Sequence, residues 1–539
     1  MKKYLLVAIN SQYIHTNLAV RYLKKYIEEY SDENIQIYET NINNQISNMI
    51  RDIFELSPDV VIFSTYIWNK EEVFKLLKEL KKVLPNIKIG LGGPEVSYGT
   101  EKILEKNEEV DFIIQGEGER ALLELVQEGI KNIGGTYSQM MPADLDEIPF
   151  PYSLNELLEE NKILYYETSR GCPFKCSYCL SSIESMLKTF SVDRVIRDLG
   201  LFLSTNIKLL KFVDRTFNIN QERMMKIWSY LIENYRPGII FHFEINANVL
   251  TEESLELLKK VPTDYFQFEV GIQTTNWATM ESINRKNSLD ELKNNIEKIP
   301  KNIHTHLDLI AGLPYETYKI FKNSFNYVHN LKPDMIQLGF LKMLKGTQIY
   351  NQIEEYEYKF TDYQPYEVLS NQFISFKEIY KLKEIEKILD YYYNSRKFKN
   401  SINFIITNYY SSSFELYEDI RDYYREKKLM DIGHKEVSLF KYLIDFFDSK
   451  QYENRDIFLE YLKFDFLNIG KVGLENEWLK RNKDSEKHND ILKNSKYTSI
   501  REGHKNTELE IFNYNILKNI PGKITILFDY KEKNFKEIY

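Results

Sequence analysis

The sequence predicts an α/β protein with an N-terminal doubly wound parallel sheet, a central partial barrel of six strand–helix units and a mostly helical C-terminal region. Two observations support this prediction. Over the first ~135 residues, short apolar runs alternate with helical patterns, which is typical of a parallel sheet covered by helices on both faces. Beyond residue ~350, glycine and proline are scarce and apolar residues recur at helical spacing, which favours helices.

The elements of the N-terminal region follow from these periodicities. Thr16 and Asn17 mark the start of the first helix, because short polar side chains cap helix N-termini. Ligands of such folds bind beyond the carboxyl ends of the strands, where the sequence is polar or glycine-rich at residues 10–17, 64–69, 90–97 and 116–119. Strands are expected at residues 4–9, 35–38, 60–64, 87–91 and 112–115, and helices at 18–30, 45–56, 70–84 and 119–126.

The remaining elements define the other domains. In a parallel barrel the carboxyl ends of the strands carry the chemistry. The C-terminal helices are expected within residues 375–393 and 437–447, and the last ~30 residues are expected to add a strand or two. The barrel strands are expected at residues 163–168, 209–213, 240–245, 265–270, 304–310 and 335–340. The predicted division is a first domain at 1–143, a linker at 144–163, the barrel at 164–349 and the C-terminal domain at 350–539.

Composition narrows the class of protein. A chain of 539 residues, 43% of them hydrophobic, is long enough for about three domains. Its net charge of −9 and pI of about 5.7 argue against a nucleic-acid-binding protein. No apolar run approaches the ~18–20 residues that cross a bilayer, and the apolar stretch after the basic start is too short for a signal peptide. We therefore expect a cytoplasmic enzyme that is not bound to a membrane.

All three cysteines, Cys172, Cys176 and Cys179, lie on one loop with the spacing C-x-x-x-C-x-x-C. Three thiolates on one loop suit three corners of a four-iron cluster, and the lack of a fourth cysteine leaves one iron with an open position. A zinc site would need a fourth ligand, and no histidine lies near the loop. Unrelated core cysteines would not all share one loop, and a disulfide here would strain the loop and leave an odd thiol. The spacing therefore favours a 4Fe–4S cluster.

The cysteine loop resembles the signature of the radical S-adenosylmethionine (SAM) enzymes, in which SAM occupies the open iron. Residues 59–66, 90–95 and 111–119 resemble the cobalamin-binding domain that precedes the radical module in one large class of these proteins, including a subfamily with an uncharacterised C-terminal domain. The resemblance implies a 4Fe–4S cluster, SAM and cobalamin as cofactors. Gly92 and Gly93 suit this role, because residues without a β-carbon let a corrin and its nucleotide tail approach the backbone closely.

The resemblance also suggests individual cofactor-binding residues. Asp214 is placed to accept a hydrogen bond from the SAM amino group, with a helix cap as the alternative. Glu269 or Gln273 would meet the ribose hydroxyls, and Gly312 would let the adenine approach. The full set of candidates is Ser11, His15, Ser64, Tyr66, Gly92, Gly93 and Glu117 in the first domain, and Tyr178, Asp214, Glu269, Gln273 and Gly312 in the barrel.

Three histidines are candidate metal ligands. Mutase-type cobalamin domains carry Asp-x-His-x-x-Gly after the first strand, but residues 10–18 hold neither the aspartate nor the glycine in register. His15 is therefore either an axial ligand of cobalt or a surface or helix-start histidine. His304 and His306 alternate on one strand, and we expect packing or surface roles for them because two histidines make a poor metal site. Glu244 is expected to line the substrate cavity.

The predicted function is that of a cobalamin-dependent radical SAM enzyme. Such an enzyme cleaves SAM reductively to a 5′-deoxyadenosyl radical, here for methyl transfer to an unactivated centre. A radical rearrangement, an oxidation or a methylthiotransferase-like reaction is an alternative, and a non-catalytic iron–sulfur protein is an alternative of another class. The expected partners are a reductant such as flavodoxin or ferredoxin and a small-molecule or peptide substrate, with no nucleic acid.

Overall fold

The structure is a computed structural model that describes residues 2–129, 134–138, 144–159, 161–183, 186–470, 478–493, 495–497 and 499–538. The chain forms two compact units. The first consists of Met1–Phe321 with Gln337–Phe376, and the second of Lys322–Ile336 with Lys377–Tyr539. In the part of the chain that is described, no helix combines the length and the apolar character needed to span a membrane.

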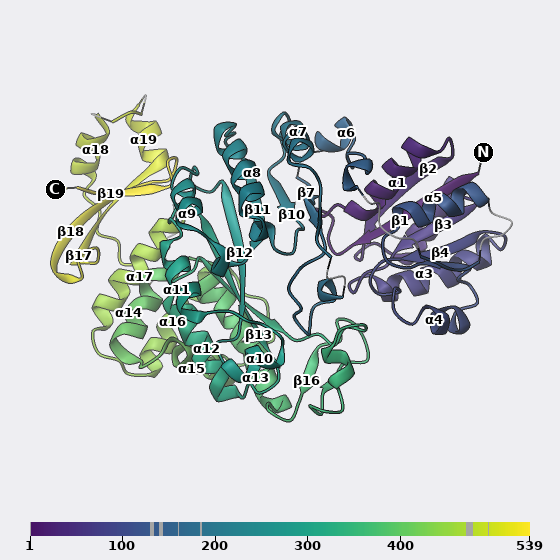
Figure 1. The fold of residues 1–539 in the computed structure, drawn as a ribbon. Coiled ribbons are helices and arrows are strands. Elements are labelled where there is room, and N and C mark those ends of the chain that lie inside the picture. The colour runs from purple at the N-terminus through teal and green to yellow at the C-terminus, as the bar shows by residue number, and fades with distance from the viewer. Residues whose placement is uncertain are drawn as a thin grey trace. The chain divides into compact units, whose positions relative to one another are not determined.

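The first unit begins with a six-stranded parallel sheet in the order β2-β1-β3-β4-β5-β6 (Figure 1). Its strands are β1 (Lys3–Asn10), β2 (Asn34–Asn41), β3 (Val60–Ser64), β4 (Lys88–Gly92), β5 (Phe112–Ile114) and β6 (Gly135–Tyr137). Its helices are α1 (Leu18–Tyr30), α2 (Ile46–Leu56), α3 (Lys70–Val83), α4 (Thr100–Lys106) and α5 (Glu119–Glu128). The sequence did not predict β6, which has three residues, or α4, which has seven residues and buries none of them.

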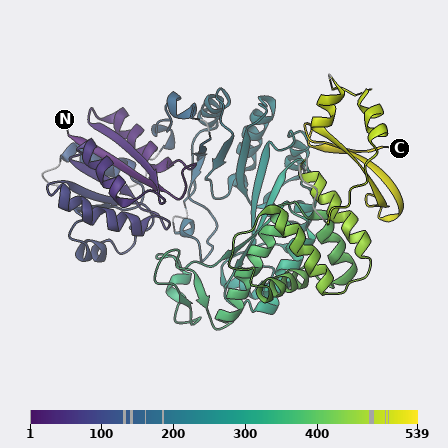
Figure 2. The ribbon, with the colours of Figure 1, turned by 180° about the vertical axis from the view of Figure 1, so that it is seen from behind.

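An apolar layer packs on each face of this sheet, because alternate residues of a strand point to opposite faces. Leu5, Val7 and Ile9 of β1 pack with apolar residues of α2 and α3. The intervening residues of β1, such as Leu6, pack with those of α1 and α5 on the other face (Figure 2). Asn17 caps α1 by accepting a hydrogen bond from the Val20 amide. The predicted doubly wound sheet is confirmed.

The second sheet of this unit has six strands in the order β14-β13-β12-β11-β10-β7. It is open, with β7 and β14 at its edges, as predicted for a partial barrel. A short hairpin of β8 (Ser169–Arg170) and β9 (Lys188–Thr189) follows the first strand. The strands are β7 (Ile163–Tyr166), β10 (Leu209–Phe212), β11 (Ile240–Ile245), β12 (Phe266–Gln273), β13 (His304–Ala311) and β14 (Met335–Phe340). The helices are α7 (Val192–Leu203), α8 (Gln221–Glu233), α9 (Glu252–Leu258), α10 (Trp277–Ser282), α11 (Leu289–Lys298) and α12 (Tyr318–Asn330).

The two faces of the barrel sheet differ sharply in polarity. Phe243, Phe266 and Phe268 are buried and pack around Trp228 of α8. The alternating positions of the same strands carry His, Glu, Gln and Asp side chains, which therefore point to the opposite face. We call this opposite face the inner face, and its ionisable side chains on β11, β12 and β13 are His242, Glu244, Glu269, His304, His306 and Asp308.

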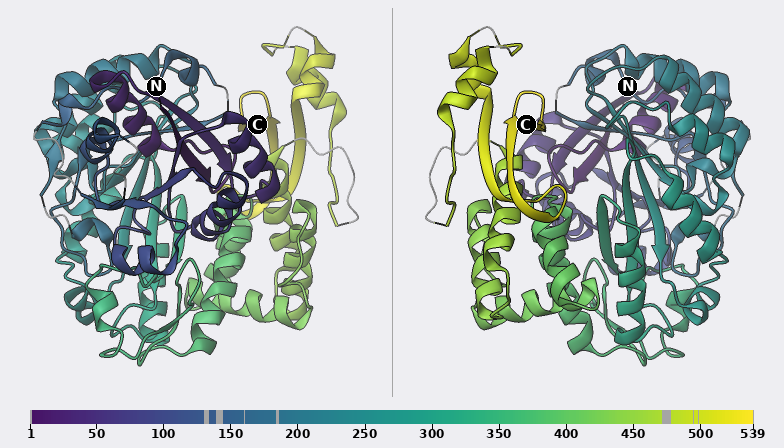
Figure 3. Two further views of the ribbon diagram at one scale, coloured as in Figure 1. Left: turned by 90° about the vertical axis from the view of Figure 1, so that its right-hand side faces the viewer. Right: turned by 90° about the vertical axis from the view of Figure 1, so that its left-hand side faces the viewer.

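The second unit is mostly helical, as predicted, and ends in a small sheet. Helix α17 packs against α14 and α16. Three antiparallel strands in the order β17-β18-β19 follow, with α18 and α19 against β17 (Figure 3). This sheet is larger than the expected strand or two. The elements are α13 (Phe376–Leu389), α14 (Lys399–Tyr409), α15 (Ser413–Glu426), α16 (Glu436–Ser449), α17 (Arg455–Ile469), α18 (Ser485–Lys493), α19 (Ile500–Asn506), β17 (Thr507–Asn515), β18 (Ile520–Asp529) and β19 (Asn534–Ile538).

We predict that Gly93→Ala destabilises the first domain much more than Gly99→Ala. Both glycines have positive φ, +103° and +74°, so both substitutions carry the same kind of backbone strain. A β-carbon at position 93 would lie 2.5 Å from the Thr65 carbonyl oxygen, whereas nothing lies within 4 Å at position 99. The free energy of unfolding of Gly93→Ala should be lower by about 2 kcal/mol or more relative to Gly99→Ala, measured in urea. Equal losses would contradict this account.

Candidate functional site

The cysteine loop follows the short strand β8 at the carboxyl end of β7. Cys172 and Cys176 are buried and Cys179 is partly buried. The Ser177 amide donates a hydrogen bond to the Ile283 carbonyl at 3.1 Å, and the Ser177 carbonyl accepts one from the Ile349 amide at 2.9 Å. The shape of the loop is therefore fixed by main-chain bonds to segments more than a hundred residues away.

The thiols do not form a site for a single metal ion. Among the described residues, the three side chains that bring ligand atoms close enough for one ion are His242, Glu269 and His306, and the cysteines form no such group. Thiols that are spread around a loop fit ligands to three different irons of a cluster, each iron taking one thiolate. The loop therefore supplies three ligands of the kind that a 4Fe–4S cluster takes.

Arg285 is a basic residue at this loop that the sequence analysis missed. Its Nη1 atom lies 3.9 Å from the Cys176 Sγ and 3.3 Å from the Tyr178 hydroxyl, and its Nη2 atom donates to the Gly271 carbonyl. Burial raises the pKa of the Cys176 thiol, and the Arg285 charge opposes that rise. Arg285 lies 109 residues from Cys176 in the chain, so no local pattern could have linked them.

Asp214 holds the segment that leads into the cysteine loop. Its buried carboxylate accepts hydrogen bonds from the Thr168 amide at 2.8 Å, the Thr168 hydroxyl at 2.7 Å and the Ser169 hydroxyl at 2.5 Å. It caps neither the short 3-10 helix Phe217–Ile219, whose N-cap residue is Thr216, nor α8, whose N-cap residue is Asn220, so the cap alternative is wrong. The contact with the SAM amino group stays a prediction.

The other predicted SAM contacts lie at or beyond strand ends. Gln273 ends β12 with φ +71°, and its Oε1 atom is buried without a hydrogen-bond partner. Gly312 follows β13 with φ +92°, and its carbonyl accepts hydrogen bonds from Tyr358 and Asn371. Glu269 lies four residues before the end of β12 and contacts His242. Their roles toward SAM stay predictions.

Carboxyl groups gather on the inner face. Burial raises the pKa of Asp308 to about 9, and the charges of Glu269 and Glu244 add to the effect. Burial likewise raises the pKa of Glu244 to about 7, with Arg215 opposing the rise. The Asp308 Oδ1 atom has no hydrogen-bond partner. This face therefore offers both donors and acceptors to a polar substrate.

The first loop of the N-terminal domain, which contains Ser11 and His15, reaches strand β7. The Nδ1 atom of His15 lies 2.5 Å from the Tyr165 hydroxyl, and the Thr16 hydroxyl donates to the Ile163 carbonyl at 2.9 Å. Partial burial lowers the pKa of His15. One ring nitrogen of His15 is therefore engaged by the barrel domain, which leaves only Nε2 for any other ligand.

The strand ends of the N-terminal sheet present glycine and flat aromatic surface. Gly92 pairs with Ser64 across β4 and β3, and Gly93 packs on Thr65. Tyr66 stacks on Trp68 with ring centroids 4.4 Å apart and planes 6° apart, and Trp68 is 40% exposed. Trp68 was not singled out in the sequence. Close backbone and an exposed aromatic plane fit a large flat cofactor such as a corrin.

Arg170, two residues before Cys172, joins the two domains. Its guanidinium is buried and pairs with Glu117 and with Glu119, at 2.7 Å, from the N-terminal domain. It also pairs with Glu167 of the barrel at 2.8 Å. Glu117, a predicted cofactor ligand, thus contacts Arg170, and its contact with cobalamin stays a prediction. Glu117 and Glu119 follow β5 and Arg170 follows β7, so their ion pairs bring the carboxyl ends of both sheets together.

Three family descriptions match successive parts of this chain. Residues 4–126 match the B12 binding domain, and residues 166–328 match the radical SAM superfamily. Residues 354–528 match a family described as protein of unknown function (DUF4080). The chain therefore contains a region that matches the B12 binding domain, followed by a region that matches the radical SAM superfamily. These domains imply a 4Fe–4S cluster, SAM and cobalamin as cofactors, as predicted.

Several relatives of the chain are named as methyltransferases. A cobalamin-dependent radical SAM methyltransferase, TokK, of Streptomyces tokunonensis is 28% identical over 303 residues, which are 50% of this chain and 44% of the relative. An uncharacterised methyltransferase of Pyrococcus horikoshii is 26% identical over 336 residues, 56% of this chain and 71% of the relative. The chain spans less than half the length of the first two curated relatives it matches.

A solved structure shares the fold. The radical SAM methyltransferase TsrM of Kitasatospora setae, solved with cobalamin and a 4Fe–4S cluster bound, matches with a TM-score of 0.54 at 14% identity. The match covers 66% of this chain and 75% of that one. This similarity confirms the predicted architecture of a B12 binding domain and a radical SAM barrel.

We predict that Arg170→Ala loosens the contact between the two domains. It would leave Glu117, Glu119 and Glu167 without their buried partner, which costs about 3–5 kcal/mol. The protein should melt at a lower temperature, and protease should cut the linker at residues 144–163 faster. Arg120→Ala is the matched control, because its ion pair with Glu147 is about 40% exposed on both sides and such pairs contribute ~0–1 kcal/mol. Similar effects of both substitutions would refute this role for Arg170.

Proposed function

We propose that this protein is a cobalamin-dependent radical SAM enzyme that transfers a methyl group to an unactivated centre of a polar substrate. One observation carries the proposal. The three-cysteine loop and the glycine and aromatic edge of the B12 binding domain lie at the same end of both sheets, joined through Arg170. The named methyltransferase relatives support the type of reaction.

The cofactors would supply the reactive chemistry. When bound, the cluster would supply the electron for reductive cleavage of SAM, and cobalamin would supply the methyl group. Cys172, Cys176 and Cys179 would hold the cluster, leaving one iron for SAM. The Ser64, Tyr66, Gly92 and Gly93 edge would hold the corrin. The electron would come from a reductant such as flavodoxin or ferredoxin.

The residues of the chain itself would position these groups. Asp214 fixes the segment that enters the cysteine loop, and Arg285 places a positive charge beside Cys176. A positive charge near a cluster favours its reduced, more negative state. Glu244 and Asp308 on the inner face would bind polar groups of the substrate.

The proposal is tested by anaerobic purification with cobalamin supplied, followed by counts of iron, sulfide and cobalt per chain. About four irons and one cobalt are expected, together with 5′-deoxyadenosine formed from SAM under reduction. Transfer of the label from SAM carrying a deuterated methyl group to a metabolite would then identify the methyl acceptor. Iron without cobalt would overturn methyl transfer and favour a radical rearrangement or oxidation.

We predict that Cys176→Ala abolishes the cluster and SAM cleavage but leaves cobalamin binding intact. The thiol is one of only three in the chain, so its loss removes a third of the iron ligands. Iron per chain should fall from about four to well below one. Ser177→Ala is the control in the same loop, because its hydroxyl has no hydrogen-bond partner and its main-chain bonds would remain. Undiminished 5′-deoxyadenosine from Cys176→Ala would defeat the cluster assignment.

We predict that His15→Ala leaves the visible and electron paramagnetic resonance spectra of bound cobalamin unchanged. His15 is engaged by Tyr165 through Nδ1, and its loop lacks the aspartate and glycine of the mutase pattern. The spectra of wild type, His15→Ala and the remote control His434→Ala should coincide. Loss of nitrogen coupling to cobalt in His15→Ala alone would make His15 the axial ligand instead.

A further inference from the structure

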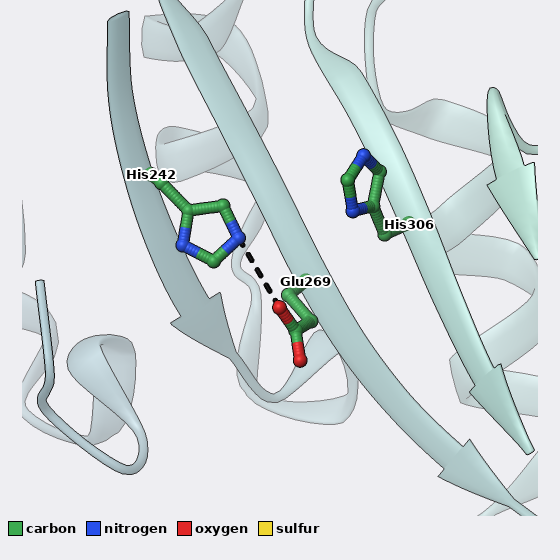
Figure 4. A group of neighbouring side chains, drawn as sticks. All are labelled: His242, Glu269 and His306. Atoms are coloured by element: carbon green, nitrogen blue, oxygen red, sulfur yellow. Dashed lines mark ion pairs between the residues drawn. The ribbon is translucent and has the colours of Figure 1, made fainter. Parts of the chain in front are cut away.

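A second cluster of ligand-type side chains lies on the inner face of the barrel, away from the cysteines. His242 comes from β11, Glu269 from β12 and His306 from β13, which are adjacent strands (Figure 4). Glu269 and His306 are paired across β12 and β13. Because all three occupy positions of one strand face, the sheet itself points them into the same space.

The three side chains approach closely enough to share one ion. The Nε2 atom of His242 lies 3.2 Å from the Glu269 Oε2 atom. One ligand atom from each residue lies within 4.8 Å of those of the other two. Ligands bind zinc and similar ions at about 2.0–2.2 Å, so small side-chain rotations without backbone movement would bring all three to one ion.

The side chains around His242, Glu269 and His306 fit a metal site better than they fit a simple histidine–glutamate ion pair. The Gln267 amide nitrogen lies 2.7 Å from the Nε2 atom and 3.4 Å from the Nδ1 atom of His306, so a polar partner of the kind that orients ligating histidines lies beside this ring. The buried Nδ1 atom of His242 has no hydrogen-bond partner.

We propose that His242, Glu269 and His306 form a binding site for a divalent first-row transition-metal ion, separate from the cluster. Two histidines and one carboxylate are the ligand set of catalytic zinc and of non-haem iron(II) sites, which keep open positions. His306 is thus a ligand, in contrast to the packing or surface role expected from the sequence, because His242 and Glu269 complete the set. That the open positions take an oxygen or nitrogen donor of the substrate rests on the function proposed above, whereas metal binding does not.

The test separates this site from the cysteines. In the full chain carrying Cys172→Ala, Cys176→Ala and Cys179→Ala, Co²⁺ is titrated and its visible absorption is followed. We expect one tightly bound ion per chain, displaced by Zn²⁺. His242→Ala, Glu269→Ala and His306→Ala in that background should each weaken binding by ~100-fold or more, since even partners of ligands contribute 10–100-fold. His434→Ala, whose ring contacts the Leu429 carbonyl, is the control and should bind as before.

The proposed metal site can be contradicted by the following results. Absence of Co²⁺ and Zn²⁺ binding, or binding that the three substitutions leave unchanged while circular dichroism shows them folded, would overturn the proposal. If the triple-cysteine chain does not fold, metal analysis of the cluster-loaded protein replaces it. Wild type should then hold one more divalent ion per chain than His242→Ala, and equal contents would overturn the site. Neither measurement requires SAM cleavage, so the proposed function can fail independently.

Discussion

The arrangement of the cofactor domains depends on the ion pairs of the buried Arg170 guanidinium. A charge that is removed from water must be paired, or it costs several kcal/mol. Arg170 meets this requirement with Glu117 and Glu119 of the B12 binding domain and Glu167 of the barrel. Because Arg170 immediately precedes Gly171 and Cys172, the same ion pairs fix where the cysteine loop begins relative to the strand ends of the first sheet.

A second group of contacts holds the cysteine loop itself. Asp214 binds Thr168 and Ser169 before the loop, and the Ile283 and Ile349 backbones bind Ser177 within it. Each contact comes from a different strand–helix unit of the barrel. The geometry of the three thiols is therefore a property of the whole barrel, and three cysteines on an isolated peptide would not have it.

Strand β12 links the two proposed metal-binding regions. Glu269 is a member of the His242–Glu269–His306 cluster, and two residues later the Gly271 carbonyl accepts a hydrogen bond from Arg285. Arg285 in turn contacts Cys176 and Tyr178. One rigid strand thus sets the spacing between the cysteine loop and the polar inner face, where a substrate would have to lie to meet a radical made at the cluster.

Features of the structure that depend on local sequence patterns could be predicted from the sequence alone. Strand and helix periodicity predicted both parallel sheets, Asn17 predicted the start of α1, and the spacing of Cys172, Cys176 and Cys179 indicated a cluster loop. The tertiary structure alone decided which distant side chains meet. Arg285 reaches Cys176 from 109 residues away, and His242 and Glu269 meet His306 from neighbouring strands. The physical reason is that strand pairing and buried charge act through space, and a single sequence records neither the register nor the partner.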